Sequence, residues 1–446
     1  MLALFSICSA GCSAESANTD EGPASGGSSS NHVGGNGGQL SSTGGTNSTT
    51  GGTATGGVTS GGTAGNATGA ATGGTGATGG AAVSPCHTAP GEAAPDQDPG
   101  VWVDVSPCGV DFASTQVGAG TILVDPVRQS DLYVNIQFNG TWKSTDYGVT
   151  WTKVSTSEHS MELDSGFAWY AAIDPNPARD PNTPPTLYVT QGYGAGGVWK
   201  STDGGVNFAN VWDHNVYKDD GTTDIFSDVG GDIHCLYVVG SNNPDHLILS
   251  LHSYWGDSGN NGVFESTDGG GKWIVHTSET FNFQPHSDVL FPIDDSTWVV
   301  SHGTTYPNLE ITRTTDAGQT WNVTDTQQVP IGRVIARTGS TIYSSSDAFG
   351  LASKSTDLGV TWTELEGSGT KAGWVAVTPT KLYVGDGYAE NPMTIRHADL
   401  DSDEVWTDDA PQPSASGIGA AVAFDGTHYI LVTAQGKGGV WRYIEP

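Results

Sequence analysis

Basic residues are scarce in this chain of 446 residues, where 16 Lys and Arg stand against 48 Asp and Glu and give a formal net charge of −32. An acidic surface repels phosphate groups, so the composition argues against nucleic acid and anionic lipid surfaces as partners. Cysteine is also rare, and the spacing of its five residues matches no zinc-ligand signature. No stretch is long and apolar enough to cross a bilayer, so contact with a membrane is expected only through a lipid anchor.

Large apolar residues are nearly absent from residues 13–85, which consist almost entirely of Gly, Ser, Thr, Ala and Asn. Such a segment cannot bury enough apolar surface to offset its conformational entropy, so we interpret it as a disordered, flexible linker. The remaining residues, 86–446, have the length of one large domain or two smaller ones.

The first twelve residues, MLALFSICSAGC, form a short apolar segment that ends at Cys12. The segment 1–12 resembles the end of a bacterial lipoprotein signal, and the resemblance implies that Cys12 carries the lipid. A basic region ahead of the apolar residues is missing, and an ordinary secretory signal is the alternative. Both interpretations predict an extracytoplasmic protein, which is either secreted or anchored as an outer-membrane lipoprotein.

Three cysteines lie beyond the signal-like segment. Cys86 and Cys108 bracket the entry to the folded domain and can form a disulfide in an oxidising compartment. Cys235 lies within an apolar segment, 233–239, and is most simply a buried thiol outside any disulfide.

A motif with the pattern S/T-T-D-x-G-x-x-W/F occurs five times, at 144–151, 201–208, 266–273, 314–321 and 355–362. The Asp carboxylate can accept hydrogen bonds from backbone N–H groups of its own turn, and the Gly supplies a residue with positive φ. The closing aromatic ring then packs back onto an apolar layer. Five copies of one tight turn indicate a repeat protein.

The motif resembles the Asp-box, or BNR, repeat of sialidase-like β-propellers, and the resemblance extends over about residues 100–446. In that family the box lies in the turn between the third and fourth strands of a blade and has a structural role. The resemblance implies this role for the five aspartates of the repeated turns, Asp146, Asp203, Asp268, Asp316 and Asp357. It says little about function, because enzymes, receptors and assembly factors all carry the motif.

Apolar segments alternate with turns rich in Asp, Pro and Asn between the boxes, which is the pattern of four antiparallel strands per unit. Five units contain a box, and two more follow without an intact one, at 374–406 and 420–443. The last unit lacks an outer strand, which residues 101–105 can supply, and this would close the ring. We therefore predict an all-β, seven-bladed β-propeller over 86–446, with six or eight blades as alternatives and no substantial helix.

The second strands predicted in five successive blades end in a polar residue followed by an aromatic one. Strand order places these ends, together with the starts of the first strands, at the mouth of the central channel. Aromatic faces beside polar groups suit sugar rings, which have apolar C–H faces and hydroxyl edges. The candidate substrate-binding residues are Tyr193, Tyr254, Trp255, Tyr306, Tyr388 and Arg333. The alternative is that the rings only wedge loops between blades.

Four histidines share this predicted rim, and with two neighbouring carboxylates they are candidate catalytic residues: His234, His252, His286, His302, Asp232 and Asp288. They could act as a general acid or base, or bind a metal ion, or each could satisfy hydrogen bonds within its own strand. The long connection 209–231 is rich in Asp and is expected to lie over the same rim as a lid. Its carboxylates could hold Ca²⁺ or simply be solvated. A divalent metal, either Ca²⁺ or a His-bound ion, is therefore left open as a cofactor.

Two functions fit these features, and we expect a monomer in both cases. The first is binding and cleavage of an extracellular polysaccharide by hydrolysis or by a lyase reaction. Hydrolysis needs two carboxylates across the scissile bond, with candidates Asp164, Asp232, Asp288, Asp347 and Asp386. Lyase chemistry would instead use a His or Tyr base with a cationic group or a metal.

Known enzymes of the resembling family set limits on this hypothesis. Sialidase activity is disfavoured, because the Arg-Ile-Pro motif of sialidases is missing. Xyloglucanase-type enzymes carry the same repeats but use a cleft between two propellers, of which this sequence contains one. The second function is a non-catalytic propeller for protein interaction or assembly, displayed on a long tether. Convergent His and Asp side chains would favour an enzyme, and dispersed ones would favour a binding module.

Overall fold

The computed structural model describes residues 97–446 and a two-residue strand, β1 (Ser6–Ile7), which pairs with β20 (Ile335–Thr338). Within 97–446 it leaves out 116, 169, 193–195, 241–242, 252–261, 278–288, 303–309, 326–328, 330, 333, 347–349, 388–393 and 410–418. The backbone alone is described for His234, His302, Asp325, Asp403 and Glu404. None of the described helices is long and apolar enough to span a bilayer.

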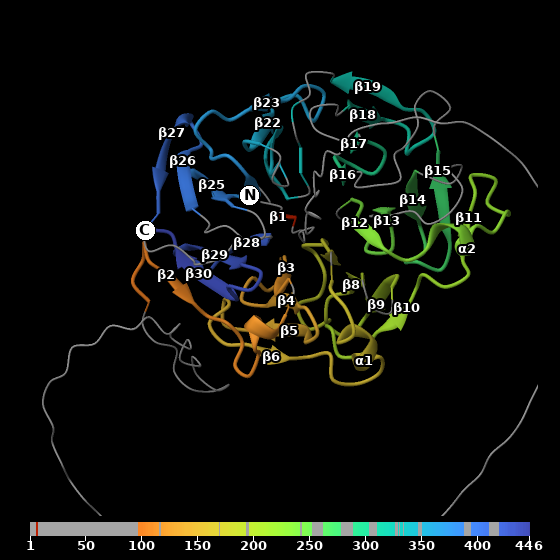
Figure 1. Cartoon of the computed structure of the whole chain (residues 1–446), viewed down its shortest axis with the longest axis horizontal. Helices are drawn as coiled ribbons and strands as arrows, with labels where there is room; N and C mark the ends of the chain where they lie inside the picture. Colours follow the sequence, from red (N-terminus) through yellow and green to blue (C-terminus); the bar gives the residue numbers. More distant parts are fainter. Residues whose placement is uncertain are drawn as a thin grey trace, which may run out of the picture. The chain divides into compact units, whose positions relative to one another are not determined.

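Seven antiparallel sheets form a seven-bladed β-propeller, and each blade has four strands (Figure 1). Blade I consists of β3 (Ala119–Val124), β4 (Leu132–Ile136), β5 (Gly140–Ser144) and β6 (Thr152–Lys153). Blade II consists of β7 (Ala171–Ile173), β8 (Leu187–Thr190), β9 (Val198–Ser201) and β10 (Ala209–Asn210). Blade III consists of β12 (Ile233–Val238), β13 (Leu247–Leu251), β14 (Val263–Ser266) and β15 (Trp273–His276).

The other four blades follow in chain order. Blade IV consists of β16 (Val289–Pro292), β17 (Trp298–His302), β18 (Glu310–Thr314) and β19 (Asn322–Asp325). Blade V consists of β20, β21 (Thr341–Ser344), β22 (Ser353–Ser355) and β23 (Thr363–Glu364). Blade VI consists of β24 (Ala372–Val377), β25 (Lys381–Asp386), β26 (Thr394–Asp399) and β27 (Ser402–Asp408). Blade VII consists of β28 (Gly419–Phe424), β29 (Tyr429–Ala434), β30 (Val440–Ile444) and β2 (Trp102–Asp104). The predicted all-β, seven-bladed fold is confirmed.

Blade VII contains strands from both ends of the propeller. β2 pairs antiparallel with β30, with Trp102 opposite Tyr443 and Asp104 opposite Trp441. Figure 1 shows the two strands side by side, β2 in orange and β30 in blue. The prediction that residues 101–105 supply the missing outer strand is therefore confirmed, and the ring is closed by strand pairing.

The repeated turns share one hydrogen-bond pattern in all five boxed blades. In blade I, Asp146 Oδ1 accepts the Thr150 N–H at 2.9 Å and the Ser144 hydroxyl at 2.7 Å. Ser144 Oγ in turn accepts the Gly148 N–H at 2.8 Å. The other four turns repeat this pattern around Asp203, Asp268, Asp316 and Asp357. The carboxylate thus satisfies N–H groups that the tight turn leaves without strand partners.

Hydrogen bonding also shifts the acidity of these carboxyl groups. Burial acts to raise the pKa of Asp203 and Asp357, but the hydrogen bonds of the turn outweigh it and lower both pKa values. Each turn joins the third and fourth strands of its blade, as the resemblance implies.

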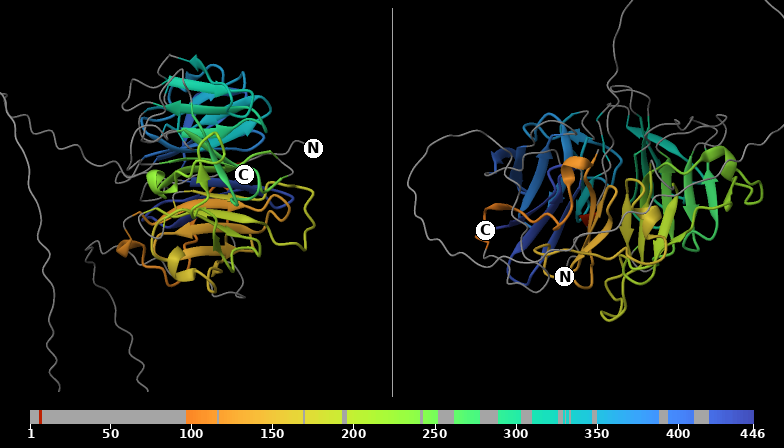
Figure 2. Two further views of the ribbon diagram at one scale, coloured as in Figure 1. Left: turned by 90° about the vertical axis from the view of Figure 1, so that its right-hand side faces the viewer. Right: turned by 60° about the horizontal axis from the view of Figure 1, so that its bottom comes forward.

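Two rims follow from the antiparallel strand order. In blade I the Tyr147 N–H of the repeated turn donates to Ser130 O in the β3–β4 connection, at 3.0 Å. In blade III the Gly269 N–H of the repeated turn donates likewise to Asp245 O in the β12–β13 connection, at 2.8 Å. First-to-second strand connections therefore lie with the repeated turns, at what we call the turn rim. The opposite ends of the strands, where second strands end, third strands begin and fourth strands end, form what we call the loop rim. Figure 2 shows the blades from two further directions.

Large aromatic side chains fill the spaces between blades. The fully buried ones include Tyr133, Tyr188, Tyr383, Trp298 and Trp374, each with 0% exposure. Because a four-stranded blade cannot cover its own faces, these rings bury apolar surface that only a neighbouring blade can shield. Cys235 is buried in β12, as predicted. Cys108 is disulfide-bonded, whereas its expected partner, Cys86, lies outside the described residues.

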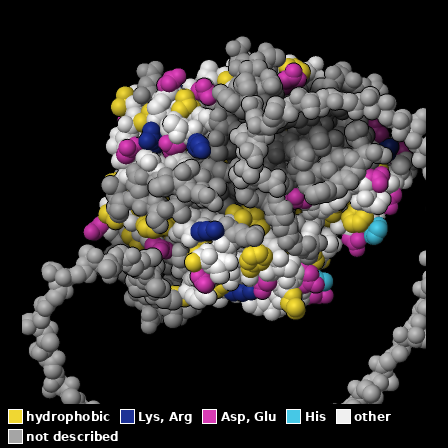
Figure 3. All heavy atoms as spheres, in the orientation of Figure 1, with side chains coloured by type: hydrophobic (Ala, Val, Ile, Leu, Met, Phe, Trp, Pro, Cys, Tyr) yellow, Lys and Arg dark blue, Asp and Glu magenta, His cyan; other side chains and the backbone are white. Residues whose placement is uncertain are grey.

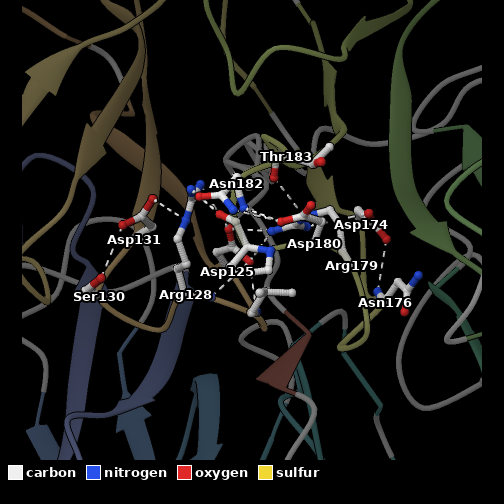
Figure 4. A network of polar contacts seen from close by, with 12 residues as sticks. Asp125, Arg128, Ser130, Asp131, Asp174, Asn176, Arg179, Asp180, Asn182 and Thr183 are labelled. Atoms are coloured by element: carbon white, nitrogen blue, oxygen red, sulfur yellow. Dashed lines mark hydrogen bonds and ion pairs between the residues drawn. The ribbon is translucent and has the colours of Figure 1, made fainter.

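Blades I and II are joined at the turn rim by a polar network (Figure 4). The Arg179 guanidinium, from the β7–β8 connection, donates to both carboxylate oxygens of Asp125, each at 2.6 Å. Asp125 lies between β3 and β4 and is fully buried. Arg128 donates to Pro181 O at 2.8 Å and contacts the Asp131 carboxylate at 3.1 Å. These contacts fix the β7–β8 connection of blade II onto blade I.

The connection 209–231 differs from the expected lid. Its middle forms β11 (Val216–Tyr217), which pairs in parallel with β15 along the outer edge of blade III. The Asn215 amide anchors this strand by donating to Gly270 O at 2.7 Å. The outer edge of β15 has backbone N–H and C=O groups without another strand partner, and pairing with them holds β11 at this edge. Described helices are short: α1 (Ser160–Leu163), α2 (Phe226–Val229) and the 3₁₀ turn Phe112–Ser114.

Candidate functional site

The loop rim collects the segments that the sequence identifies as candidate sites. β13 ends at Leu251, directly before His252, and β17 ends at His302. β12 begins at Ile233, directly before His234. The side chains themselves are not described for His234 and His302. Ten other candidates lie outside the described residues: Tyr193, His252, Tyr254, Trp255, His286, Asp288, Tyr306, Arg333, Asp347 and Tyr388.

Two candidate carboxylates on the described part of this rim have contacts of their own. Asp164 accepts from the Lys153 ammonium with both oxygens, at 2.8 Å and 2.6 Å. Asp386 Oδ1 accepts the backbone N–H groups of Thr370 and Lys371, at 2.8 Å and 2.7 Å. Asp232 is half-buried just before β12. Asp164 follows α1 in the connection from blade I to blade II, and Asp386 ends the second strand of blade VI.

Metal binding has no support among the residues that the structure describes, since no group of three or more His, Cys, Asp or Glu side chains there is placed to hold an ion. Asp220, in the connection 209–231, instead accepts the Thr222 and Thr223 N–H groups, at 2.7 Å and 2.8 Å. This is the hydrogen bonding of a solvated Asx turn.

Phe138 is a feature of the loop rim that our sequence analysis missed. It follows β4 in blade I, and its side chain is 44% exposed. Its backbone N–H donates to Gly166 O at 3.1 Å, which links the β4–β5 connection to the segment after α1. Gln137-Phe138 repeats, in blade I, the polar–aromatic order that marks the other second-strand ends. This signal was present in the sequence.

The Lys153 and Asp164 side chains lie near Gly140, where the β4–β5 connection ends and β5 begins. A Cβ atom placed on Gly140 would come within 2.6 Å of Asp164 Oδ1 and 3.5 Å of the Lys153 side chain. Gly140 has φ +68°, so the position is restricted to glycine both by space and by backbone conformation. The Lys153 and Asp164 side chains keep 28% and 32% of their surface exposed. We call Phe138, Lys153 and Asp164 the Phe138 patch.

A second polar cluster, His246–Glu265–His276, lies on blade III and faces blade IV. Glu265, on β14, is bound by His246 Nε2 at 2.7 Å and by His276 Nε2 at 2.8 Å. The His276 ring contacts Trp298 of blade IV, with ring centroids 5.8 Å apart. Burial acts to raise the pKa of Glu265, but the two histidine hydrogen bonds outweigh it and lower the pKa to about 2. We interpret this cluster as a joint between blades.

The Glu265 carboxylate is expected to stabilise the propeller in a pH-dependent way. Its pKa falls from 4.5 to about 2 on folding, so the ionised group stabilises the fold above pH 4.5. That stabilisation is lost as the pH falls to about 2, and we expect it to be about 2 kcal/mol after allowing for solvent screening. Denaturant unfolding of wild type and Glu265→Gln from pH 7 to pH 2 measures it. The difference in free energy of unfolding between wild type and Glu265→Gln should shrink as the pH falls from 4.5 to about 2. The control Glu366→Gln changes an exposed residue, so its free energy of unfolding should stay near that of wild type at every pH.

The strand order and the described rim define a closed, seven-bladed β-propeller whose loop rim carries, in blade I, an exposed aromatic residue and an ion pair. No protein-family model matches the sequence. The xyloglucanase Xgh74A of Acetivibrio thermocellus is 27% identical over 187 residues, which are 39% of this chain and 21% of the enzyme. A xyloglucanase from a Paenibacillus species is 24% identical over 288 residues, 51% of this chain and 27% of the enzyme. The chain thus spans only about a fifth to a quarter of these relatives.

Solved structures with a similar fold are more distant in sequence. YCF48 from Cyanidioschyzon merolae has a TM-score of 0.49 and 12% identity, covering 77% of this chain and 98% of that one. The GH74 xyloglucanase from Xanthomonas campestris has a TM-score of 0.47 and 18% identity, covering 77% of this chain and 53% of that one.

Proposed function

We propose that this propeller binds a neutral extracellular polysaccharide of the xyloglucan type at its loop rim. The local similarity to two xyloglucanases carries the proposal, since 187 residues of this chain are 27% identical to Xgh74A. The exposed ring of Phe138 on the same rim supports it, because a sugar ring stacks its C–H face on an aromatic side chain.

A neutral polymer fits the charge of the protein. The net charge of −32 repels the carboxylates of uronate-rich polysaccharides. Figure 3 shows acidic side chains spread over the described part of one face, with few Lys and Arg side chains among them. Stacking and hydroxyl hydrogen bonds need no cationic site, so a neutral glycan avoids this repulsion.

Our proposal covers binding and leaves hydrolysis to experiment. Asp164 is paired with Lys153, and Asp386 accepts two backbone N–H groups, so both carboxylates already have partners within their own loops. Cleavage would depend on carboxylates such as Asp288 and Asp347, which lie outside the described residues. Because the polymer is extracellular, we also propose export, with a lipid anchor at Cys12.

Binding of purified domain 86–446 to a polysaccharide panel tests the proposal. We expect binding to xyloglucan that resists 0.5 M NaCl and added EDTA. The Debye length at this salt concentration is about 4 Å, so charge–charge interactions are screened whereas stacking on an aromatic ring is unaffected. Polygalacturonate should not bind. Reducing-end assays on the same samples report cleavage. Failure to bind any neutral glycan, or a preference for the polyanion, would refute the proposed function.

A further inference from the structure

Phe138 adopts a backbone conformation that is unusual for a bulky residue. Its φ is +61°, and the Asn139 N–H donates to Ile136 O at 2.9 Å, so it is the third residue of a tight turn. This position favours Gly or Asn, because a Cβ atom there crowds the backbone. A phenylalanine at such a site carries a conformational cost that its neighbours must offset.

The repeated turns account for half of the described non-glycine residues with positive φ, and Phe138 is not among them. Among the described non-glycine residues, six have positive φ, and three of these, Tyr147, Ala317 and Leu358, follow the Asp of a repeated turn. Phe138 belongs to no repeated turn, and its ring is 44% exposed. A lone exposed ring is ordinary, but here exposure is combined with a strained backbone. A strained backbone costs stability and an exposed ring gains less from burial than a core ring does, and this combination points to a role in binding.

The ion pair of the Phe138 patch retains hydrogen-bonding capacity. Lys153 has three N–H donors and directs bonds to the two oxygens of Asp164. The carboxylate has about four acceptor positions, so both partners can still bind hydroxyl groups. The turn that carries Phe138 lies near this pair. The Phe138 N–H donates to Gly166 O, two residues after Asp164, and a Cβ on Gly140 would come within 2.6 Å of Asp164 Oδ1. An aromatic face and an acceptor–donor pair match the apolar face and hydroxyl edge of a pyranose.

From these observations we infer that the Phe138 patch is a saccharide subsite, in which Phe138 stacks on a neutral pyranose ring and Lys153 and Asp164 bind its hydroxyl groups. The inference rests on the proposed function and locates one contact of the polymer on blade I. The strained turn presents the ring to solvent, and Gly140 lets the ion pair pack against the turn.

Calorimetry with xyloglucan oligosaccharides on single variants tests the subsite. Phe138→Gly should weaken binding about tenfold while the melting temperature stays equal or rises, because Gly relieves the strained turn. Phe138→Asn, which also tolerates positive φ, provides a second folded variant. Phe138→Tyr should retain binding, and Asp164→Asn should weaken it about threefold to tenfold. The matched control is Phe424→Ala, which removes an exposed ring (37%) at the turn-rim end of β28 and should bind like wild type.

Each outcome decides a different question. Wild-type affinity in both Phe138→Gly and Phe138→Asn would refute the subsite and leave the proposed function intact. Absence of binding in the wild-type protein would refute both. Equal losses in Phe138→Gly and Phe424→Ala would show a general effect on the fold and would also overturn the assignment.

Discussion

Replacing Asp125 by Ala is expected to lower the free energy of unfolding by about 3 kcal/mol, because the buried Arg179 guanidinium loses its close partner and keeps only the longer ion pair with Asp174, at 3.5 Å. Asp125 is 0% exposed and receives both bonds from Arg179, whose side chain is only 7% exposed. Asp125 Oδ1 also accepts the Val127 N–H of its own turn at 2.9 Å. The substitution therefore removes a connection between blades I and II as well as a local bond.

Denaturant unfolding of a double-mutant cycle measures the coupling between the two residues. Asp125→Ala combined with Arg179→Met should be less destabilised than the sum of the single variants, because the double variant no longer buries the Arg179 charge opposite a missing Asp125 carboxylate. Asp203→Ala is the control, since it removes a carboxylate from an exposed repeated turn and should cost about 1 kcal/mol. A loss in Asp125→Ala no larger than in Asp203→Ala would contradict a role for this pair in joining the blades.

Three of the few basic residues lie on third strands and bind groups of their own or a neighbouring blade. Lys143 pairs with Asp131 at 2.7 Å, and Lys200 pairs with Asp245 of the next blade at 2.8 Å. Arg442 of blade VII donates to Tyr147 O in blade I at 2.8 Å. Blade III has Glu265 at the corresponding third-strand position, with two histidines as its partners. Lys200 and Arg442 thus use their charge or N–H groups to link neighbouring blades, whereas Lys143 pairs within blade I.

Local chemistry explains why the fold could be predicted from sequence. The Ser, Asp and Gly of each repeated turn bond one another within five residues, so spacing alone specifies the turn. Ring closure was also predictable, because the last unit visibly lacked one strand. The role of β11 was not, since pairing with β15 joins residues more than fifty positions apart.

The candidate site was predictable only in part. Strand order assigns the ends of the second strands to one rim, but it does not determine which side chains converge there. Phe138 had the same polar–aromatic signal as the other candidates, yet its exposure and positive φ are properties of the folded turn. The contacts of Asp164 and Asp386 likewise come from residues 11 and 15–16 positions away, across separate loops.

Trp102→Ala is expected to destabilise the propeller by about 3–5 kcal/mol, as for a large core aromatic residue replaced by Ala. Trp102 is 2% exposed in β2, and its indole N–H donates to Asp409 Oδ2 at 3.2 Å. Its ring stacks on Tyr443 with centroids 4.9 Å apart. The residue therefore fastens the N-terminal strand both to β30 and to Asp409, which follows blade VI.

Two milder variants separate the contribution of the Trp102 ring packing from that of its hydrogen bond to Asp409. Trp102→Phe keeps a buried ring but removes the donor to Asp409, so we expect a loss of about 1–2 kcal/mol. Val101→Ala changes a neighbouring residue that is 36% exposed and should stay within about 0.5 kcal/mol of wild type. Denaturant unfolding and limited proteolysis near residues 97–105 provide the measurements. If closure by β2 stabilises the ring, Trp102→Ala should be cleaved there faster than Val101→Ala, and equal cleavage would show that the ring holds without this strand.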